Sequence, residues 1–188
     1  FLTLDSSFQY RTAEDWSYTI DDGYLSYGTP ASLDQAAIGM EFRGKADPLG
    51  LFLSEVKLGN EEALTGTITV EAPTAAAGDT DAYLAAVNLV SPDAAEKIGF
   101  TAKLAFADFF HIDGSFAFDN IALARFLHTQ GKEHRLSATA DFSGSPDAFL
   151  FRFNISQLLM FVRGQTLKAS GNLVIENEKA DLIVSEIE

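Results

Sequence analysis

The 188-residue chain contains no cysteine, which excludes a disulfide scaffold, a thiol nucleophile and a cysteine-bound metal. Long apolar runs are also missing. The longest stretches without a charged residue, 23–33 and 82–92, fall well short of the ~20 residues that cross a bilayer as a helix. Positive charge is scarce, with 13 basic against 27 acidic residues and a net charge of −14. Because such a surface repels phosphate backbones, we expect no nucleic-acid partner.

Sequence motifs of catalysis are equally scarce. The chain has no Gly-rich phosphate loop and no Gly-x-Ser-x-Gly nucleophile elbow. His111, His128 and His134 lack the spacing of a zinc-binding helix, and no Asp-rich calcium loop is complete. We therefore predict that the protein is not an enzyme and has no catalytic residue, no metal site and no cofactor.

The dominant positive signal is an alternation of apolar and polar residues, which is typical of strands because successive strand side chains point to opposite faces. Three segments near the C-terminal end place their apolar residues on one face: Phe100–Phe106, Leu136–Phe142 and Leu167–Ile175. Their residues Leu104, Leu136 and Leu167 are 32 and 31 residues apart, a period typical of stacked repeats. We predict one β-rich module over 1–188, with repeat units 64–99, 100–131, 132–164 and 165–188.

Helical signals follow some of these strands. A capping residue, apolar residues at i, i+3 and i+4, and a terminal Gly predict short helices over Asn120–Gly131 and Ser156–Gly164. Similar signals predict two more over Asp79–Val90 and Ser91–Gly99. The expected repeat unit is therefore strand, turn, strand and short helix.

Phenylalanine is abundant, with 16 in 188 residues, and most of it falls on the apolar faces of predicted strands. Two all-β architectures accommodate such faces. One is a closed two-sheet β-sandwich, and the other is an elongated antiparallel sheet, folded over along its axis to form a hydrophobic groove. Open-ended repeats favour the groove, which can hold acyl chains because each buried CH₂ contributes ~0.8 kcal/mol. The expected lining residues are Phe100, Leu104, Phe106, Phe116, Phe118, Leu136, Phe142, Phe149, Phe151, Phe153, Leu173 and Ile175.

Several strands follow the pattern Leu-x-Gly-x-hydrophobic-x-hydrophobic or a close variant: Leu64–Val70, Ile112–Phe118 and Ala169–Ile175. In this pattern the chain resembles the AsmA-like superfamily, and within it the TamB-like translocation and assembly module proteins. The resemblance implies a periplasmic segment of an envelope protein that is anchored in the inner membrane. It also implies a β-groove that conducts phospholipid or another acyl-chain ligand toward the outer membrane, or that works with outer-membrane assembly proteins.

Two other functions are open on the sequence alone. A non-catalytic recognition module on a β-sandwich, binding carbohydrate or protein, would use exposed Trp16, Tyr18, Tyr24 and Tyr27. A chaperone would add client strands to an exposed sheet edge. The direction of the Phe rows separates the first of these from the lipid hypothesis, since a closed core favours the sandwich and an open apolar face favours lipid binding.

Overall fold

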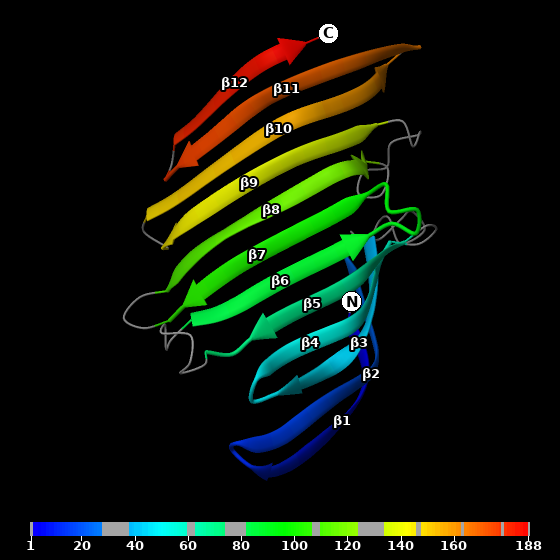
Figure 1. Cartoon of the computed structure of the whole chain (residues 1–188), viewed down its shortest axis with the longest axis vertical. Coiled ribbons are helices and arrows are strands. Elements are labelled where there is room, and N and C mark those ends of the chain that lie inside the picture. The colour runs from blue at the N-terminus through cyan, green and yellow to red at the C-terminus, as the bar shows by residue number, and fades with distance from the viewer. Residues whose placement is uncertain are drawn as a thin grey trace.

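The structure is a computed structural model that describes residues 2–27, 38–59, 63–73, 82–106, 110–123, 134–145, 148–162, 164–177 and 179–187. All of its strands belong to one antiparallel sheet of twelve strands, whose order in the sheet is their order in the chain (Figure 1). The fold is therefore all-β, elongated and open, as predicted. The alternative of two packed sheets is wrong, because every described strand lies in the same sheet.

The strands of the N-terminal half are β1 (Leu2–Thr12), β2 (Asp15–Tyr27), β3 (Ile38–Asp47), β4 (Gly50–Leu58), β5 (Leu64–Glu71) and β6 (Ala82–Val90). Those of the C-terminal half are β7 (Lys97–Ala105), β8 (His111–Ala122), β9 (Arg135–Ser145), β10 (Ala148–Val162), β11 (Gln165–Glu176) and β12 (Lys179–Ile187). Each strand pairs with the strands before and after it, so β1 and β12 form the two edges.

Register aligns the apolar residues of neighbouring strands. Residues that pair directly point to the same face of a sheet, and the pairings connect one row through all twelve strands. This row runs through Ser6, Ile20, Gly44, Leu53, Ile68, Val87, Phe100, Phe116, Ala140, Phe153, Leu173 and Leu182. We call the side of the sheet to which this row points the apolar face, and the opposite side the polar face.

Bulges interrupt the ladder at corresponding places in alternate strands. An extra residue enters β2 near Asp21, β4 near Ser54, β8 near Asn120, β10 near Ser156 and β12 at Ser185. A bulge bends its strand and increases the local twist. It also shifts the alternation by one residue, which keeps apolar side chains on the same face on both sides of the bend.

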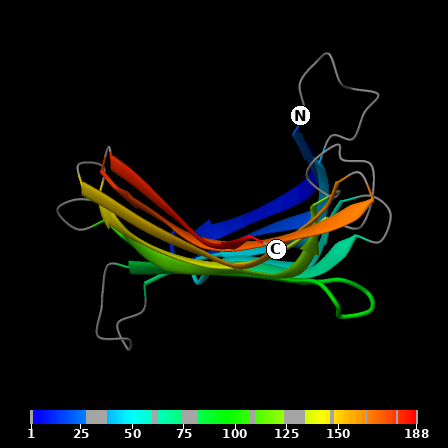
Figure 2. The same ribbon diagram turned by 90° about the horizontal axis from the view of Figure 1, so that it is seen from above.

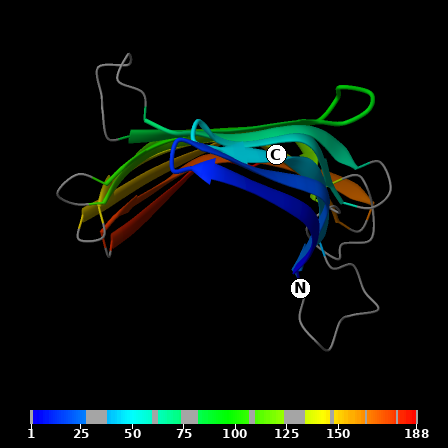
Figure 3. The same cartoon turned by 90° about the horizontal axis from the view of Figure 1, so that it is seen from below.

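The sheet is bent across its strands, as the end-on views show (Figures 2 and 3). We infer that the apolar face lies on the inside of this bend, because the most buried side chains of the sheet belong to it. Leu64, Val56 and Ile121 are at most 1% exposed on it, although no second layer of described strands covers them. Side chains on the inside of a curved sheet are forced together, so a single layer can bury them.

The predicted short helices are wrong wherever the structure describes them. Ala82–Val90 is strand β6, Ser91–Gly99 is a turn followed by the start of β7, and β10 continues through Ser156 to Val162. Of Asn120–Gly131, residues 120–122 are strand and 124–131 lie outside the described residues. In Ser156–Gly164 the helical spacing arises because Phe161, on the polar face of β10, is apolar like Leu158 and Val162 on the apolar face, so that apolar residues recur at i, i+3 and i+4.

The repeat segments occupy alternate strands. Phe100–Phe106 begins in β7, Leu136–Phe142 lies in β9 and Leu167–Ile175 lies in β11. These strands all run in the same direction, and the boundaries of the expected units at 132–164 and 165–188 each enclose one hairpin. Among the described residues, the structure contains no helix that is long and apolar enough to cross a membrane.

Candidate functional site: the apolar face of the sheet

The apolar face carries no charged side chain in any described strand. In β7 and β8, for example, Lys103 pairs with Asp113 on the polar face, while their neighbours Leu104 and Ile112 pair on the apolar face. The same separation holds along the other strand pairs, where Arg43 faces Glu55 and Arg152 faces Asp141 on the polar side. Water therefore solvates the polar face of the sheet well and the apolar face poorly.

The structure brings the predicted lining residues together. By register, all of them except Phe106 lie on the apolar face: Phe100, Leu104, Phe116, Phe118, Leu136, Phe142, Phe149, Phe151, Phe153, Leu173 and Ile175. Phe106 follows the end of β7 and extends this surface, because its ring contacts Tyr83 at a centroid distance of 5.8 Å. Tyr83 pairs with Leu104 and so belongs to the same face.

The aromatic rings on this face reach across intervening strands. Phe100 of β7 stacks on Phe142 of β9 at 5.9 Å between centroids, although β8 lies between them. Gly114 makes this contact possible, because a Cβ there would lie 2.4 Å from Phe142 Cζ. In the same way Phe116 of β8 contacts Phe153 of β10 at 5.8 Å across Ala140.

One part of the apolar face is sealed by its own side chains. The buried cluster consists of Ile20, Phe42, Leu53, Val56, Leu64, Leu89 and Ile121, which come from β2 to β8. Phe118, Ile98 and Val87 pack against it. This cluster lies where the bulged N-terminal strands bend, so the face is closed there by packing within the sheet.

The C-terminal part of the same face stays open. Met160 of β10 is 36% exposed, and Leu182, Val184 and Ile187 of β12 are 66%, 54% and 66% exposed. Six phenylalanines of β7 to β10 on this face are half-buried: Phe100, Phe116, Phe118, Phe142, Phe151 and Phe153. The described structure therefore offers an apolar surface of aromatic and aliphatic side chains that meets solvent toward β12.

A polar network fixes the turn between β6 and β7 against this surface. Glu96 is buried, and its Oε2 accepts a hydrogen bond from the backbone N–H of Ala122 at 3.1 Å. Its Oε1 lies 3.7 Å from Nη1 of Arg135. The pairing of β8 with β7 ends at Asp119 and Lys97, so the backbone N–H of Ala122 has no partner in β7. The Glu96 carboxylate accepts the hydrogen bond that such a partner would accept. In the same turn the Ser91 hydroxyl donates to Asp93, which lowers the pKa of that carboxyl.

Two of the hollows in the described part of the structure lie on the polar face. One, of about 540 Å³, is lined by hydroxyl and charged groups that include Thr101, Ser115, Glu71 and Asp141. The other, of about 610 Å³, lies beside the β2 bulge and is bordered by Arg43. Both are open, and neither includes a predicted lining residue. Within the described ranges, no group of three or more His, Asp or Glu residues is placed to hold a metal ion.

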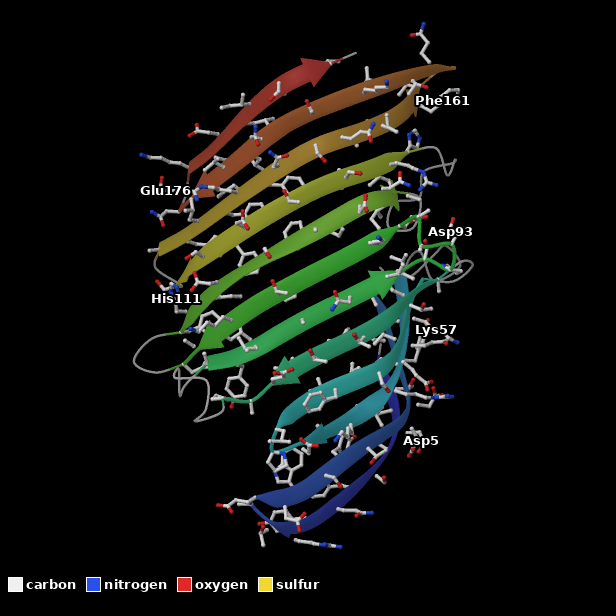
Figure 4. All side chains as sticks on the ribbon, viewed as in Figure 1. Asp5, Lys57, Asp93, His111, Phe161 and Glu176 are labelled. Atoms are coloured by element: carbon white, nitrogen blue, oxygen red, sulfur yellow. The ribbon has the colours of Figure 1, made fainter. Side chains whose placement is uncertain are left out.

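Charged side chains project at the two long sides of the sheet, near the strand ends. Lys57 and Asp93 lie on one side, and His111 and Glu176 lie on the other (Figure 4). Several of these charges are paired on the exposed surface, as in His111 with Asp113 at 3.0 Å. Charged side chains therefore lie along the borders of the apolar face, and the described strands place none on the face itself.

The aromatic residues of the alternative recognition site do not share one surface. Trp16 and Tyr18 lie on the apolar face, where Phe8 contacts both at 6.4 Å between centroids. Tyr24 lies on the polar face, where it pairs with Glu41. The side chain of Tyr27 is outside the described residues. The described part of this set is therefore divided between opposite faces.

Sequence reasoning missed several residues of the apolar face. Helical signals over Asp79–Val90 conceal Tyr83 and Leu89 of β6, although Tyr83, Ala85, Val87 and Leu89 alternate as a strand requires. Leu182 and Val184 of β12 are hard to recognise because the apolar Ile183 lies between them on the polar face, which weakens the alternation. Their assignment to the apolar face becomes clear from the residues with which they pair on neighbouring strands: Tyr83 pairs with Leu104, and Leu182 pairs with Leu173.

Comparison with protein-family models, with curated proteins and with solved structures found no match to the chain.

Proposed function

We propose that the apolar face binds the acyl chains of lipids and conducts them along the sheet. The observation that carries this proposal is the complete separation of charge, since no described strand places a charged side chain on that face while its C-terminal part is open to solvent. An uncovered apolar surface of this extent in a protein with a net charge of −14 is typical of a binding surface.

The length of the sheet supports conduction rather than a single closed pocket. Strands are about 4.8 Å apart, so twelve of them extend over roughly 50 Å. A bilayer core of about 30 Å contains two acyl chains end to end, so one chain is about 15 Å long. The open part of the face, from β7 to β12, takes up about half of this length and is therefore longer than one acyl chain, so that a chain on it has neighbouring positions of the same chemistry to move to.

The same geometry separates the acyl chain from the head group. Each CH₂ that leaves water for the apolar face contributes about 0.8 kcal/mol, whereas a charged phosphate or ammonium group has no counter-charge there. A lipid bound in this way keeps its head group in water, above the open side of the bend. The ring surfaces of Phe116, Phe151 and Phe153, which are in mutual contact, provide the central part of this binding surface.

Within this proposal the protein is a non-catalytic segment of an AsmA-like, TamB-like envelope protein. Its location is the periplasm, its ligand is phospholipid or another acyl-chain lipid, and its partners are outer-membrane assembly proteins. Support for this assignment comes from the repeated Gly-containing strand pattern and from the open, bent sheet with one apolar face.

Two neighbouring residues of β12 provide a matched test of face-specific binding. Leu182 lies on the apolar face and is 66% exposed, whereas Ile183 lies on the polar face and is 63% exposed. Replacing either by Asp adds the same charge to the same strand at the same exposure. Neither change removes a buried contact, so both variants should fold like the parent.

Binding of a fluorescent fatty acid is then titrated with the parent protein, Leu182→Asp and Ile183→Asp. We expect Leu182→Asp to weaken binding by at least about tenfold, since this corresponds to 1.4 kcal/mol and a desolvated carboxylate costs more. Ile183→Asp should bind like the parent. Equal affinities in the two variants, or no binding by the parent, would contradict the proposal.

A further inference from the structure

We propose that the protein docks on a zwitterionic bilayer through exposed aromatic side chains at one long side of the apolar face, and that acyl chains reach the face from there. Three residues form this aromatic cluster: Tyr83 of β6, Phe106 just after β7 and Phe110 just before β8. The Phe106 ring contacts Tyr83 at 5.8 Å and Phe110 at 5.4 Å between centroids. Because docking would supply the apolar face with its ligand, the proposal rests on the lipid binding proposed above.

The aromatic cluster is open to solvent. Tyr83, Phe106 and Phe110 are 38%, 56% and 39% exposed, although their rings are in contact. A contiguous apolar patch of this kind marks a site of interaction with a membrane or with another protein. Tyrosine is suited to a membrane surface, because its ring lies against hydrocarbon while its hydroxyl stays in water.

The aromatic cluster continues directly into the apolar face. Tyr83 pairs with Leu104, and Leu104 pairs with Ile112. The same row continues through Gly144 of β9 to Phe149 of β10. An acyl chain that leaves a bilayer at the aromatic cluster therefore meets only uncharged residues along this row.

The opposite long side of the apolar face is closed. Leu64, Leu89 and Ile121 lie near strand ends on the side that carries Lys57 and Asp93, and each is at most 3% exposed. The aromatic cluster lies on the other side, where Figure 4 shows His111. Entry across the closed side would separate packed side chains, whereas entry at the aromatic cluster separates none of these buried contacts. The arrangement thus favours the aromatic side as the place where lipid arrives.

A bilayer fits this surface better than a protein strand does. The strands β6, β7 and β8 pair with neighbours on both sides, so they have no free backbone edge for strand addition. Lys103, His111 and Asp113 of the adjoining strand ends lie on the polar face, so the contact would be apolar rather than ionic. A net charge of −14 repels an anionic lipid surface, which favours a zwitterionic one.

Vesicle binding by the whole chain tests this docking. Flotation with phosphatidylcholine vesicles is measured for the parent, for Phe106→Asp and for the control Leu84→Asp. Leu84 is 50% exposed and lies near the same strand ends, but it pairs with Lys103 on the polar face. Both side chains are exposed, so both variants should keep the parent circular dichroism spectrum.

We expect Phe106→Asp to weaken vesicle binding by at least about tenfold, because a carboxylate is strongly disfavoured in the apolar part of a bilayer. Leu84→Asp should bind like the parent. High salt should leave the binding of the parent intact, since salt screens ionic contacts and not apolar ones.

A fluorophore provides a second measurement that does not depend on introducing a charge. The chain contains no cysteine, so an environment-sensitive dye can be attached at one site in Phe106→Cys or in Leu84→Cys. Phosphatidylcholine vesicles should shift the emission of the dye at position 106 to shorter wavelength. The dye at position 84 should keep its emission in water.

Docking would be overturned if the parent did not bind vesicles, if Phe106→Asp and Leu84→Asp bound equally well, or if the two dyes responded alike. The fatty-acid titration uses a dissolved ligand and no vesicles, so it is decided separately. A parent that binds fatty acid but no vesicle refutes the docking alone. A parent that binds vesicles but no fatty acid supports the docking surface and contradicts acyl-chain binding by the apolar face.

Discussion

Leu64 and Leu182 are both apolar residues of predicted or observed strands, but their side chains contribute very differently to the stability of the fold. Both lie on the apolar face, Leu64 at 0% exposure in the sealed part and Leu182 at 66% in the open part. Replacing each by Ala removes the same three carbon atoms. The comparison therefore measures how tightly the face is packed at β5 and at β12.

The size of the effect follows from these exposures. Three buried carbons contribute about 2.4 kcal/mol at ~0.8 kcal/mol each, and an unfilled cavity raises the cost of a buried Leu→Ala change to as much as about 5 kcal/mol. Leu64→Ala should therefore lower the free energy of unfolding by about 2.5 to 5 kcal/mol. Only about a third of Leu182 is buried, so Leu182→Ala should cost less than about 1 kcal/mol.

Urea unfolding at equilibrium gives both values. Circular dichroism follows the whole sheet, and the fluorescence of Trp16, the single tryptophan, follows β2 next to the sealed part. The slope of the transition should be the same in the two variants, so that the midpoint alone reports stability. Equal losses in both variants, or a larger loss in Leu182→Ala, would refute the division into a sealed and an open part.

Two further changes test the packing that shapes the apolar face. Glu96→Ala should lower the free energy of unfolding by about 1 to 3 kcal/mol, because it leaves the backbone N–H of Ala122 unpaired. Thermal unfolding measures this loss. Glu96→Gln is the control, because it keeps an acceptor oxygen and should cost less. Gly114→Ala should cost about 1 to 3 kcal/mol in the same assay, because the added Cβ meets the Phe142 ring at 2.4 Å, whereas Gly99→Ala meets nothing within 4 Å and should be neutral. A neutral Glu96→Ala, or equal effects of the two glycine changes, would contradict these contacts.

The sequence alone was sufficient to predict the all-β class, the open sheet and the shared face of the phenylalanine rows. Alternation assigns a side chain to one of two faces without any knowledge of the turns. Alternation therefore assigns Phe149, Phe151 and Phe153 to one face, and Leu173, the partner of Phe153 on the next strand, lies on the same face. The same logic holds for any strand whose partners are also apolar on one face.

Bulges and curvature could not be predicted in this way. At Ser156 an extra residue shifts the alternation, so the apolar face continues from Ile155 to Leu158 by a three-residue step that simple alternation does not predict. The difference between buried Leu64 and exposed Leu182 depends on how sharply the sheet bends over each of them. That bend is produced by several strands together, and no single segment encodes it.

Lipid binding by the open apolar face is tested most directly by mass spectrometry of an organic extract of the protein after purification from cell envelopes. We expect phospholipid or fatty acid to be extracted from the parent in a defined molar ratio, and the amount to fall in Leu182→Asp but not in Ile183→Asp. An extract without lipid, or the same lipid content in the two variants, would contradict the account.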